Sequence, residues 1–167
     1  MSAAPPAVAP VLVFAWGNRS RGDDALGPLC LERLRAVAAA DPGVEFLEDY
    51  QLQVEHALDL VGRTRVLFID ASRAGAAPFV VTQLQARHDP SFTSHAMSPQ
   101  ALLQVYVDLH GEMPAPCTLL GIAAASFELG EPPSQQALAN LEAATCWAQA
   151  WIGNPARVRE ARICGTP

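Results

Sequence analysis

Three short runs with the character of strands, each leading into acidic residues, most constrain what this chain can fold into. They lie at residues 11–16, 44–48 and 66–70, and the third is apolar until it reaches Asp70. A strand that is covered on both faces has such an unbroken apolar character. Between the first two runs, residues 25–40 carry apolar side chains at helical spacing. This alternation predicts a mostly parallel sheet between layers of helices.

Further elements extend this pattern along the chain. We expect a short helix at residues 54–62, strands at residues 79–84 and 117–123, and longer helices at residues 98–110 and 134–152. The link between the third and fourth strands is too short for a helical crossover. The fourth strand is therefore expected to run antiparallel, as a hairpin partner of the third. The predicted fold class is α/β, with a mostly parallel five-stranded sheet that contains one antiparallel strand.

Length and composition indicate one packed domain. The chain has 167 residues, 50% of them hydrophobic, and a domain commonly holds roughly 100–200 residues. We expect residues 1–10 to form a flexible leader, residues 11–152 a single domain, and residues 153–167 a loosely held tail. The leader has no basic side chain, and no stretch approaches the roughly 18 apolar residues of a membrane span. The expectation is a cytoplasmic monomer without membrane contact.

Charge and cysteine usage exclude several classes of protein. The net charge is -6 and all basic residues are Arg. Nucleic acids are bound by clustered Lys and Arg, so a nucleic-acid partner is disfavoured. Without Lys, the chain has no Schiff-base chemistry and no Walker-type phosphate loop. No C-x-x-C pair or G-x-S-x-G elbow occurs, which argues against zinc-finger, thioredoxin and serine-hydrolase functions. The cysteines are Cys30, Cys117, Cys146 and Cys164, and their scatter suits reduced thiols.

Acidic side chains gather at one predicted edge of the sheet. The first strand leads into an acidic pair at residues 23–24, the second into one at residues 48–49, and the third ends at Asp70. The carboxyl ends of parallel strands share one edge, and carboxylates placed together raise each other's pKa unless a cation joins them. His95 lies in the loop before the helix at residues 98–110. Asp24, Asp70 and His95 together suit a borderline divalent metal ion.

Each of these residues also has a plainer interpretation. Asp24 would cap the helix that follows it, since Asp is a favoured N-cap. Asp70 would hydrogen-bond its own turn, and His95 would be an exposed loop residue. Glu48 and Asp49 would be solvated turn residues. It is the joint placement of these residues at one edge that favours a site.

A series of motifs along the chain resembles the pattern of one known family. Residues 17–27, GNRSRGDDALG, resemble its opening motif of a GN, a spacer and a pair of acids followed by a glycine. Residues 68–71, FIDA, resemble its strand-ending Asp, and residues 95–97, HAM, its loop histidine. Residues 121–122, GI, and residues 126–128, SFE, resemble its G-I and S-x-E segments. The motifs keep this order across nearly the whole predicted domain, and the chain therefore resembles the hydrogenase maturation endopeptidases.

The resemblance implies a fold, a site and an activity. The implied fold is a three-layer α/β/α sandwich with a twisted five-stranded sheet. The implied catalytic and metal-binding residues are Asp24, Asp70 and His95. The implied substrate is the precursor of a nickel–iron hydrogenase large subunit, which would carry the nickel and lose its C-terminal extension. Asp23 or Glu48 would serve as a base, and an acid-type mechanism with two carboxylates sharing a proton stays open.

The segment after the second strand departs from the family pattern. The family commonly has D-G-G there, in a loop held to contact the substrate. This chain has Glu48, Asp49, Tyr50 and Gln51, which we expect to bind the substrate, although the change puts recognition in doubt. Residues 50–56 resemble the subgroup that serves NAD-reducing bidirectional hydrogenases. His56 itself, on the predicted short helix, is expected at the surface.

Two other functions remain open from the residues. One is a docking module that binds the nickel site of the immature subunit without cleaving it, through the same ligands. The other is a flavodoxin-like or nucleotide-binding domain. Its only candidate phosphate loop is residues 19–22, RSRG, and the acids that follow directly would repel phosphate.

Overall fold

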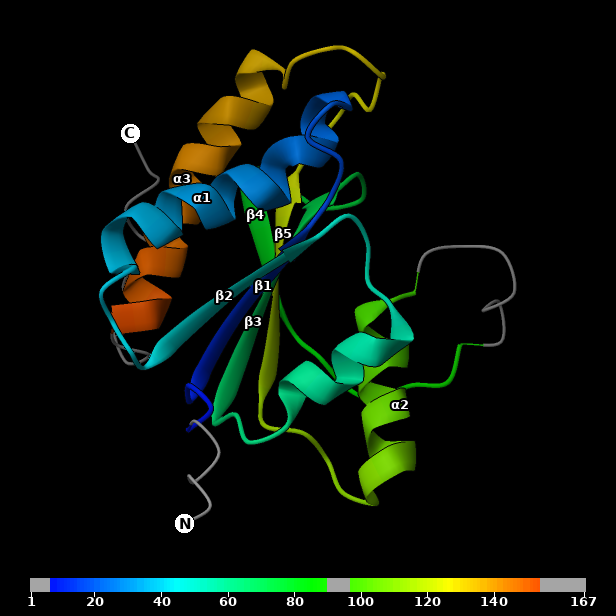
Figure 1. The fold of residues 1–167 in the computed structure, drawn as a ribbon. Coiled ribbons are helices and arrows are strands. Elements are labelled where there is room, and N and C mark those ends of the chain that lie inside the picture. The colour runs from blue at the N-terminus through cyan, green and yellow to red at the C-terminus, as the bar shows by residue number, and fades with distance from the viewer. Residues whose placement is uncertain (1–6, 90–96, 154–167) are drawn as a thin grey trace.

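Five strands form a single sheet in this computed structural model, which describes residues 7–89 and 97–153 (Figure 1). They are β1 (Val11–Trp16), β2 (Val44–Asp49), β3 (Arg65–Ser72), β4 (Phe79–Gln83) and β5 (Cys117–Ala123). Their order is β2-β1-β3-β5-β4, and each neighbouring pair is parallel except β4 and β5. The predicted α/β class, with one antiparallel strand in a mostly parallel sheet, is confirmed.

Helices cover both faces of the sheet, which gives three layers (Figure 1). On one face, α1 (Leu26–Ala38) packs beside α3 (Gln135–Gly153), and a short 3-10 turn, η1 (Gly22–Ala25), leads into α1. On the other face lie α2 (Pro99–His110) and a 3-10 segment, η2 (Val54–Leu60). The helix expected at residues 25–40 therefore begins with a tighter turn than the sequence indicated.

Local sequence signals set both ends of α2. The Ser98 side chain accepts a hydrogen bond from the Ala101 backbone N–H at 3.2 Å, and Pro99 occupies the first helical position. Gly111 ends the helix with a φ of 70°. Ser satisfies an N–H that has no helical partner, Pro lacks that N–H, and Gly adopts the left-handed conformation without a Cβ clash. The apolar side of α2 therefore meets the sheet over a defined length.

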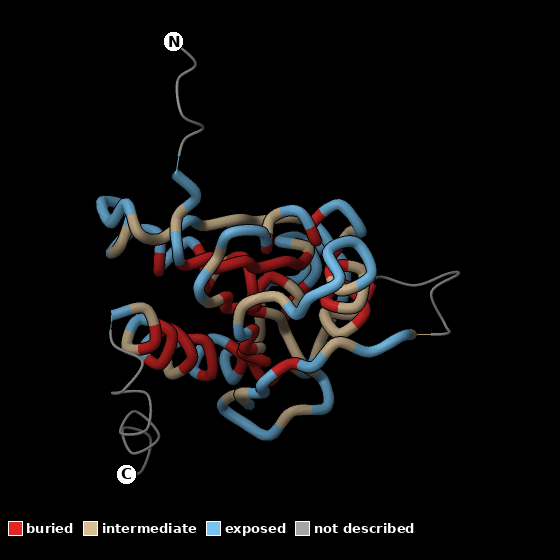
Figure 2. Tube along the Cα trace, turned by 90° about the horizontal axis from the view of Figure 1, so that it is seen from below, coloured by how far each residue is buried: buried red, intermediate tan, exposed pale blue. Residues whose placement is uncertain are grey.

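The sheet divides the core into two layers, because successive side chains of a strand point to opposite faces. In β1, Val13 and Ala15 pack towards α1 and α3, whereas Leu12, Phe14 and Trp16 pack towards α2. Figure 2 shows the buried residues, in red, concentrated in the middle of the molecule. The second layer reaches Trp16, the last residue of β1, and so extends to the edge of the sheet where the acidic residues were predicted.

The partner of β4 differs from the predicted one. Instead of forming a hairpin with β3, β4 pairs antiparallel with β5, and Val80 lies opposite Gly121. β5 pairs in parallel with β3 and so lies between β3 and β4. The short link between β3 and β4 determines that β4 runs antiparallel to β3. It does not determine whether another strand lies between them. The apolar strand β5 is favoured inside, where both of its faces are covered.

None of the helices in the described residues is long and apolar enough to cross a membrane. The predicted leader and C-terminal tail fall mostly outside the described ranges, and their boundaries stay predictions.

Candidate active site

Asp70 and Asp24 lie near each other at the carboxyl edge of the sheet. Asp70 lies in β3 and is half-buried, and Asp24 lies in η1 just after β1. The pKa of Asp70 is raised to about 7, first by burial and also by the nearby charge of Asp24, against hydrogen bonds from Ala71 and Trp16 that lower it. Two of the three predicted ligands are therefore neighbours, as the shared edge of parallel strands required.

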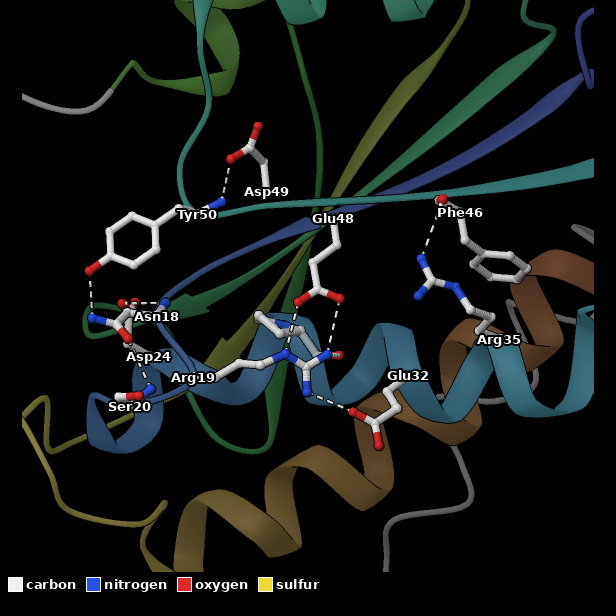
Figure 3. A network of polar contacts seen from close by, with 11 residues as sticks. Asn18, Arg19, Ser20, Asp24, Glu32, Arg35, Phe46, Glu48, Asp49 and Tyr50 are labelled. Carbon is white, nitrogen blue, oxygen red and sulfur yellow. Dashed lines mark hydrogen bonds and ion pairs between the residues drawn. The ribbon is translucent and has the colours of Figure 1, made fainter.

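The chain around Gly17 and Asn18 holds Asp24 in place. Gly17 has a φ of 145°, and a Cβ there would lie 2.1 Å from the Asp24 carbonyl oxygen. A side chain at this position would therefore push the two segments apart. The Asn18 backbone N–H donates to Asp24 Oδ2 at 2.9 Å (Figure 3). The GN pair thus has a structural use, which is to let the chain pass close to Asp24 and to orient its carboxylate.

The plainer interpretations of these two acids fare differently. Asp24 does not cap the helix after it, since neither η1 nor α1 receives a side-chain cap in the structure. Asp70 does bond its own turn, through the backbone of Ala71. That hydrogen bond lowers the pKa of Asp70, but by less than burial raises it.

Asp23, the other member of the acidic pair, is fully buried. Its carboxylate accepts hydrogen bonds from the backbone N–H groups of Ala125, Ser126 and Ser134 at 2.8, 3.1 and 2.7 Å, and from the Ser134 hydroxyl at 3.2 Å. Burial raises the pKa of Asp23, but these bonds outweigh it and the net shift is downward. The structure gives Asp23 a structural role and argues against its use as a base.

Glu48, at the end of β2, is engaged by an arginine. Arg19 Nε and Nη2 donate to its two carboxylate oxygens at 2.8 and 3.0 Å, and Arg19 Nη1 also contacts Glu32 at 2.6 Å (Figure 3). The Arg19 hydrogen bond is the main reason why the pKa of Glu48 is lowered and that of Arg19 is raised. A carboxylate held in such a bidentate pair is a poor base and a poor free ligand.

The remaining predicted substrate residues lie at the end of β2 and directly after it. Asp49 accepts from the Tyr50 backbone N–H at 2.6 Å and lies 3.0 Å from His56 Nε2. Tyr50 is exposed, and its hydroxyl accepts a hydrogen bond from Asn18 Nδ2 at 2.5 Å (Figure 3). Gln51 is also exposed. The loop is thus accessible at Tyr50 and Gln51, and it is tied to the segment that orients Asp24.

His56 was expected at the surface, and that prediction is wrong. The residue is buried, with its ring edge-on to Phe14 at 4.7 Å between centroids. Its Nδ1 accepts from the Gln53 backbone N–H at 2.9 Å, in a capping box at the start of η2. The polar residue three positions before His56 was the signal that could have indicated this role.

His95 lies outside the described residues, so its predicted ligand role stays a prediction. Within residues 7–89 and 97–153, no group of three His, Cys, Asp or Glu side chains could hold a metal ion. The chemistry of the pair that is present fits a cation, because two carboxylates share the site and one has a pKa raised by burial and by its neighbour. A divalent ion would stabilise the charged form of Asp70 and so offset the rise in its pKa that burial and Asp24 cause.

A cleft of about 290 Å³ adjoins Asp70. It is lined from the end of β3, the link to β4, β4 itself and β5. Gly121, which the sequence indicates only as part of the G-I motif, lines this cleft. Its position became clear only from the cross-strand register, which sequence spacing does not reveal.

The chain has the fold of hydrogenase maturation proteases. It is similar to the [NiFe] hydrogenase maturation protease HycI of Thermococcus kodakarensis, with a TM-score of 0.70, 21% identity, and coverage of 87% of this chain and 94% of the other. It also resembles the hydrogenase maturating endopeptidase HybD of E. coli, with a TM-score of 0.64, 23% identity, and coverage of 86% and 93%. A hydrogenase 2 maturation peptidase of a Thaumarchaeota archaeon gives a TM-score of 0.62 and 24% identity, with coverage of 86% and 97%.

No family model matches the sequence, and no curated protein matches it significantly. The likeness is therefore one of fold, and it confirms the three-layer α/β arrangement.

Proposed function

We propose that this chain is an endopeptidase that removes the C-terminal extension from the nickel-loaded large-subunit precursor of a nickel–iron hydrogenase. The observation that carries the proposal is the pair Asp24 and Asp70 at the carboxyl edge of the sheet. Open α/β sheets bind their ligands at this edge. The similarity of the whole fold to hydrogenase maturation proteases supports the same function.

In the proposed mechanism, Asp24, Asp70 and His95 bind the nickel that the substrate carries. Bound nickel would polarise the scissile carbonyl or lower the pKa of a water molecule. The chain's own contribution is positioning, which supplies on the order of 7–11 kcal/mol at best. Asn18 orients Asp24 through its backbone N–H, and Trp16 and Ala71 bond to Asp70. Neither Asp23 nor Glu48 is assigned as a base, since their carboxylates are occupied.

Substrate recognition is assigned to the loop after β2. Glu48 and Asp49 shape this loop through Arg19 and His56, and Tyr50 and Gln51 present exposed side chains. The sequence of residues 50–56 supports the subgroup that serves NAD-reducing bidirectional hydrogenases. We expect the protein to act as a cytoplasmic monomer, which size-exclusion chromatography with light scattering would check.

The test uses the purified chain and a nickel-loaded, C-terminally extended large subunit. The mass of the subunit is followed with time for the wild type and for Asp24→Ala, Asp70→Asn and His95→Ala. His110→Ala is a matched control, because His110 is exposed at the end of α2. Loss of a short C-terminal peptide with the wild type and the control, but not with the three variants, is the expected result. Precursors from NAD-reducing and from other hydrogenases are compared to test the subgroup.

Other outcomes would redirect the proposal. Nickel-dependent binding without any change of mass would favour the docking module over the protease. Full processing by Asp70→Asn would remove Asp70 from the site. If the chain neither binds nor cleaves the precursor, the proposed function as a whole is contradicted.

A further inference from the structure

The cleft beside Asp70, here called the Asp70 cleft, is formed by three adjacent strands and one link. Its lining consists of Asp70, Ala71, Ser72, Ala74, Gly75, Ala76, Val80, Thr82, Leu119 and Gly121. On the β4 side the lining residues Val80 and Thr82 are exposed, whereas Gly121 on β5 is buried. The cleft therefore opens to solvent at β4 and has its closed end in the sheet, next to a predicted catalytic residue.

The cleft owes its floor to Gly121. In the sheet register, Gly121 lies between Asp70 of β3 and Val80 of β4, and directly opposite side chains in neighbouring strands point to the same face. A side chain at position 121 would thus stand between Asp70 and Val80. A Cβ there would lie 3.3 Å from Ser72 Cβ, which is tight, and larger side chains would extend into the cleft. The missing side chain leaves open space beside the Asp70 carboxyl group.

The lining chemistry limits what the cleft can hold. Among the described residues that line it, Asp70 is the only ionisable one, and the rest are small, aliphatic or hydroxyl-bearing. Its volume of about 290 Å³ lies just below the usual range for drug-sized ligands and cofactors, roughly 300–1,000 Å³. A single uncharged side chain of a bound peptide fits these limits better than a cofactor does.

The position of β4 gives a peptide access. Within the described part of the chain, β4 is the last strand on its side of the sheet. An extended peptide whose backbone lies near Asp70 can place one side chain over Gly121, pointing towards Val80 on the exposed strand β4. Pockets beside extended peptide sites commonly supply specificity in this way.

We propose that the Asp70 cleft is a specificity pocket that receives an uncharged aliphatic side chain of the precursor, next to the bond that is cleaved. The inference rests on the proposed function and adds the chemical class of the residue that the site selects. Gly121 and Val80 are its specificity-determining residues, because one leaves the space open and the other bounds it at β4.

The experiment changes the size of the pocket and of the substrate together. Precursors with Gly, Val, Leu or Phe at each residue flanking the cleaved bond are processed by the wild type, Val80→Phe, Gly121→Val and Val80→Ala. The two filling variants should lose at least about tenfold in kcat/KM for the Leu precursor and little for the Gly precursor. Val80→Ala should shift the preference towards Phe.

The matched control is Val37→Phe, since Val37 is exposed on α1. Thermal unfolding shows whether the Gly121→Val variant folds. If that variant does not fold, Val80→Phe still tests the proposal, because Val80 lies on the exposed strand β4. The same order of preference in all variants would overturn the proposal while leaving the peptidase function intact.

A second measurement separates the two proposals. N-acetyl-leucinamide is titrated into the isotope-labelled chain, and amide chemical shifts are followed by NMR. Shifts at Gly75 and Gly121 that disappear in Val80→Phe support the pocket, even if the wild type cleaves no precursor and the peptidase function fails. No shift at these residues, together with unchanged preferences, would refute the pocket.

Discussion

Asp23 and Asp24 are adjacent in the sequence, yet their carboxylates have opposite surroundings. Asp23 is fully buried, with hydrogen bonds from three backbone N–H groups and one hydroxyl. Asp24 is partly exposed, accepts one hydrogen bond from Asn18, and lies near a second carboxylate, Asp70, whose pKa it raises. The difference teaches that an acidic pair can divide its work. Asp23 accepts hydrogen bonds on both carboxylate oxygens and fixes the loop, whereas Asp24, at the edge of the sheet, accepts one on Oδ2 alone from the described residues.

The largest expected effect is on activity at the Asp24 side of this comparison. Asp24→Asn should keep the fold, because Asn can still accept the Asn18 hydrogen bond, but it should lower precursor processing by at least about 100-fold. It should also weaken Ni²⁺ binding to the isolated chain, measured by isothermal titration calorimetry. Loss of stability equal to that of Asp23→Asn would erase the distinction between the two acids.

Asp23→Asn should act mainly on stability. An amide cannot accept from all the donors around Asp23, and its own NH₂ group would face them. The buried N–H groups left without partners should cost about 3 kcal/mol of unfolding free energy. Urea denaturation measures this, with Asp108→Asn on the exposed side of α2 as the control. Wild-type stability in Asp23→Asn would contradict a structural role.

A smaller effect is expected where the substrate loop meets Asp24. Asn18→Ala removes the side-chain bonds to the Ser20 backbone N–H and to the Tyr50 hydroxyl, but it keeps the backbone N–H that holds Asp24. Losing these hydrogen bonds should raise the activation free energy of processing by about 1 kcal/mol, so the rate of processing should fall about fivefold. Tyr50→Phe removes the hydroxyl alone and should show part of the decrease in kcat with KM little changed. Equal rates for the wild type and both variants would show that the loop and Asp24 are independent.

The smallest effect concerns Glu48, whose surroundings lie between those of Asp23 and Asp24. Its lowered pKa, caused chiefly by Arg19, means that the ion pair stabilises the fold above the unfolded-state value of 4.5. This stabilisation is lost as the pH falls through the lower folded-state pKa. Glu48→Gln should therefore cost less than about 1 kcal/mol near neutral pH and nothing in strong acid, as compared by urea denaturation. A cost that grows in acid would have the wrong sign.

Much of the fold was predictable, because strand and helix positions follow from local patterns. The strands at residues 11–16 and 117–123 and the cap at Ser98 were found with their observed bounds. The partner of β4 was not predicted, because the length of the link between β3 and β4 indicates the direction of β4 but not which strand lies between the two. That choice depends on how all the strands compete for the centre of the sheet.

The candidate site was predictable in part for a related reason. Topology alone placed Asp24 and Asp70 at one edge, and the structure brings them together. The role of Asp23 was hidden, because its partners lie 102 to 111 positions further along the chain. His56 was misplaced because its burial comes from packing on Phe14 and from Asp49. Such contacts are set by the tertiary fold and leave little trace in local sequence.

The hydrogen bonds of Asp23 to residues far along the chain also imply an order of folding. The turn that carries Asp24 is fastened by the segment leading into α3, so it cannot be fully anchored until that segment has been synthesised. Contacts between such distant residues form late in folding, after the entropy of closing the loop has been overcome. A growing chain on the ribosome would thus display β1 and its acids long before they could work. Completion of the site would coincide with the arrival of the last helix.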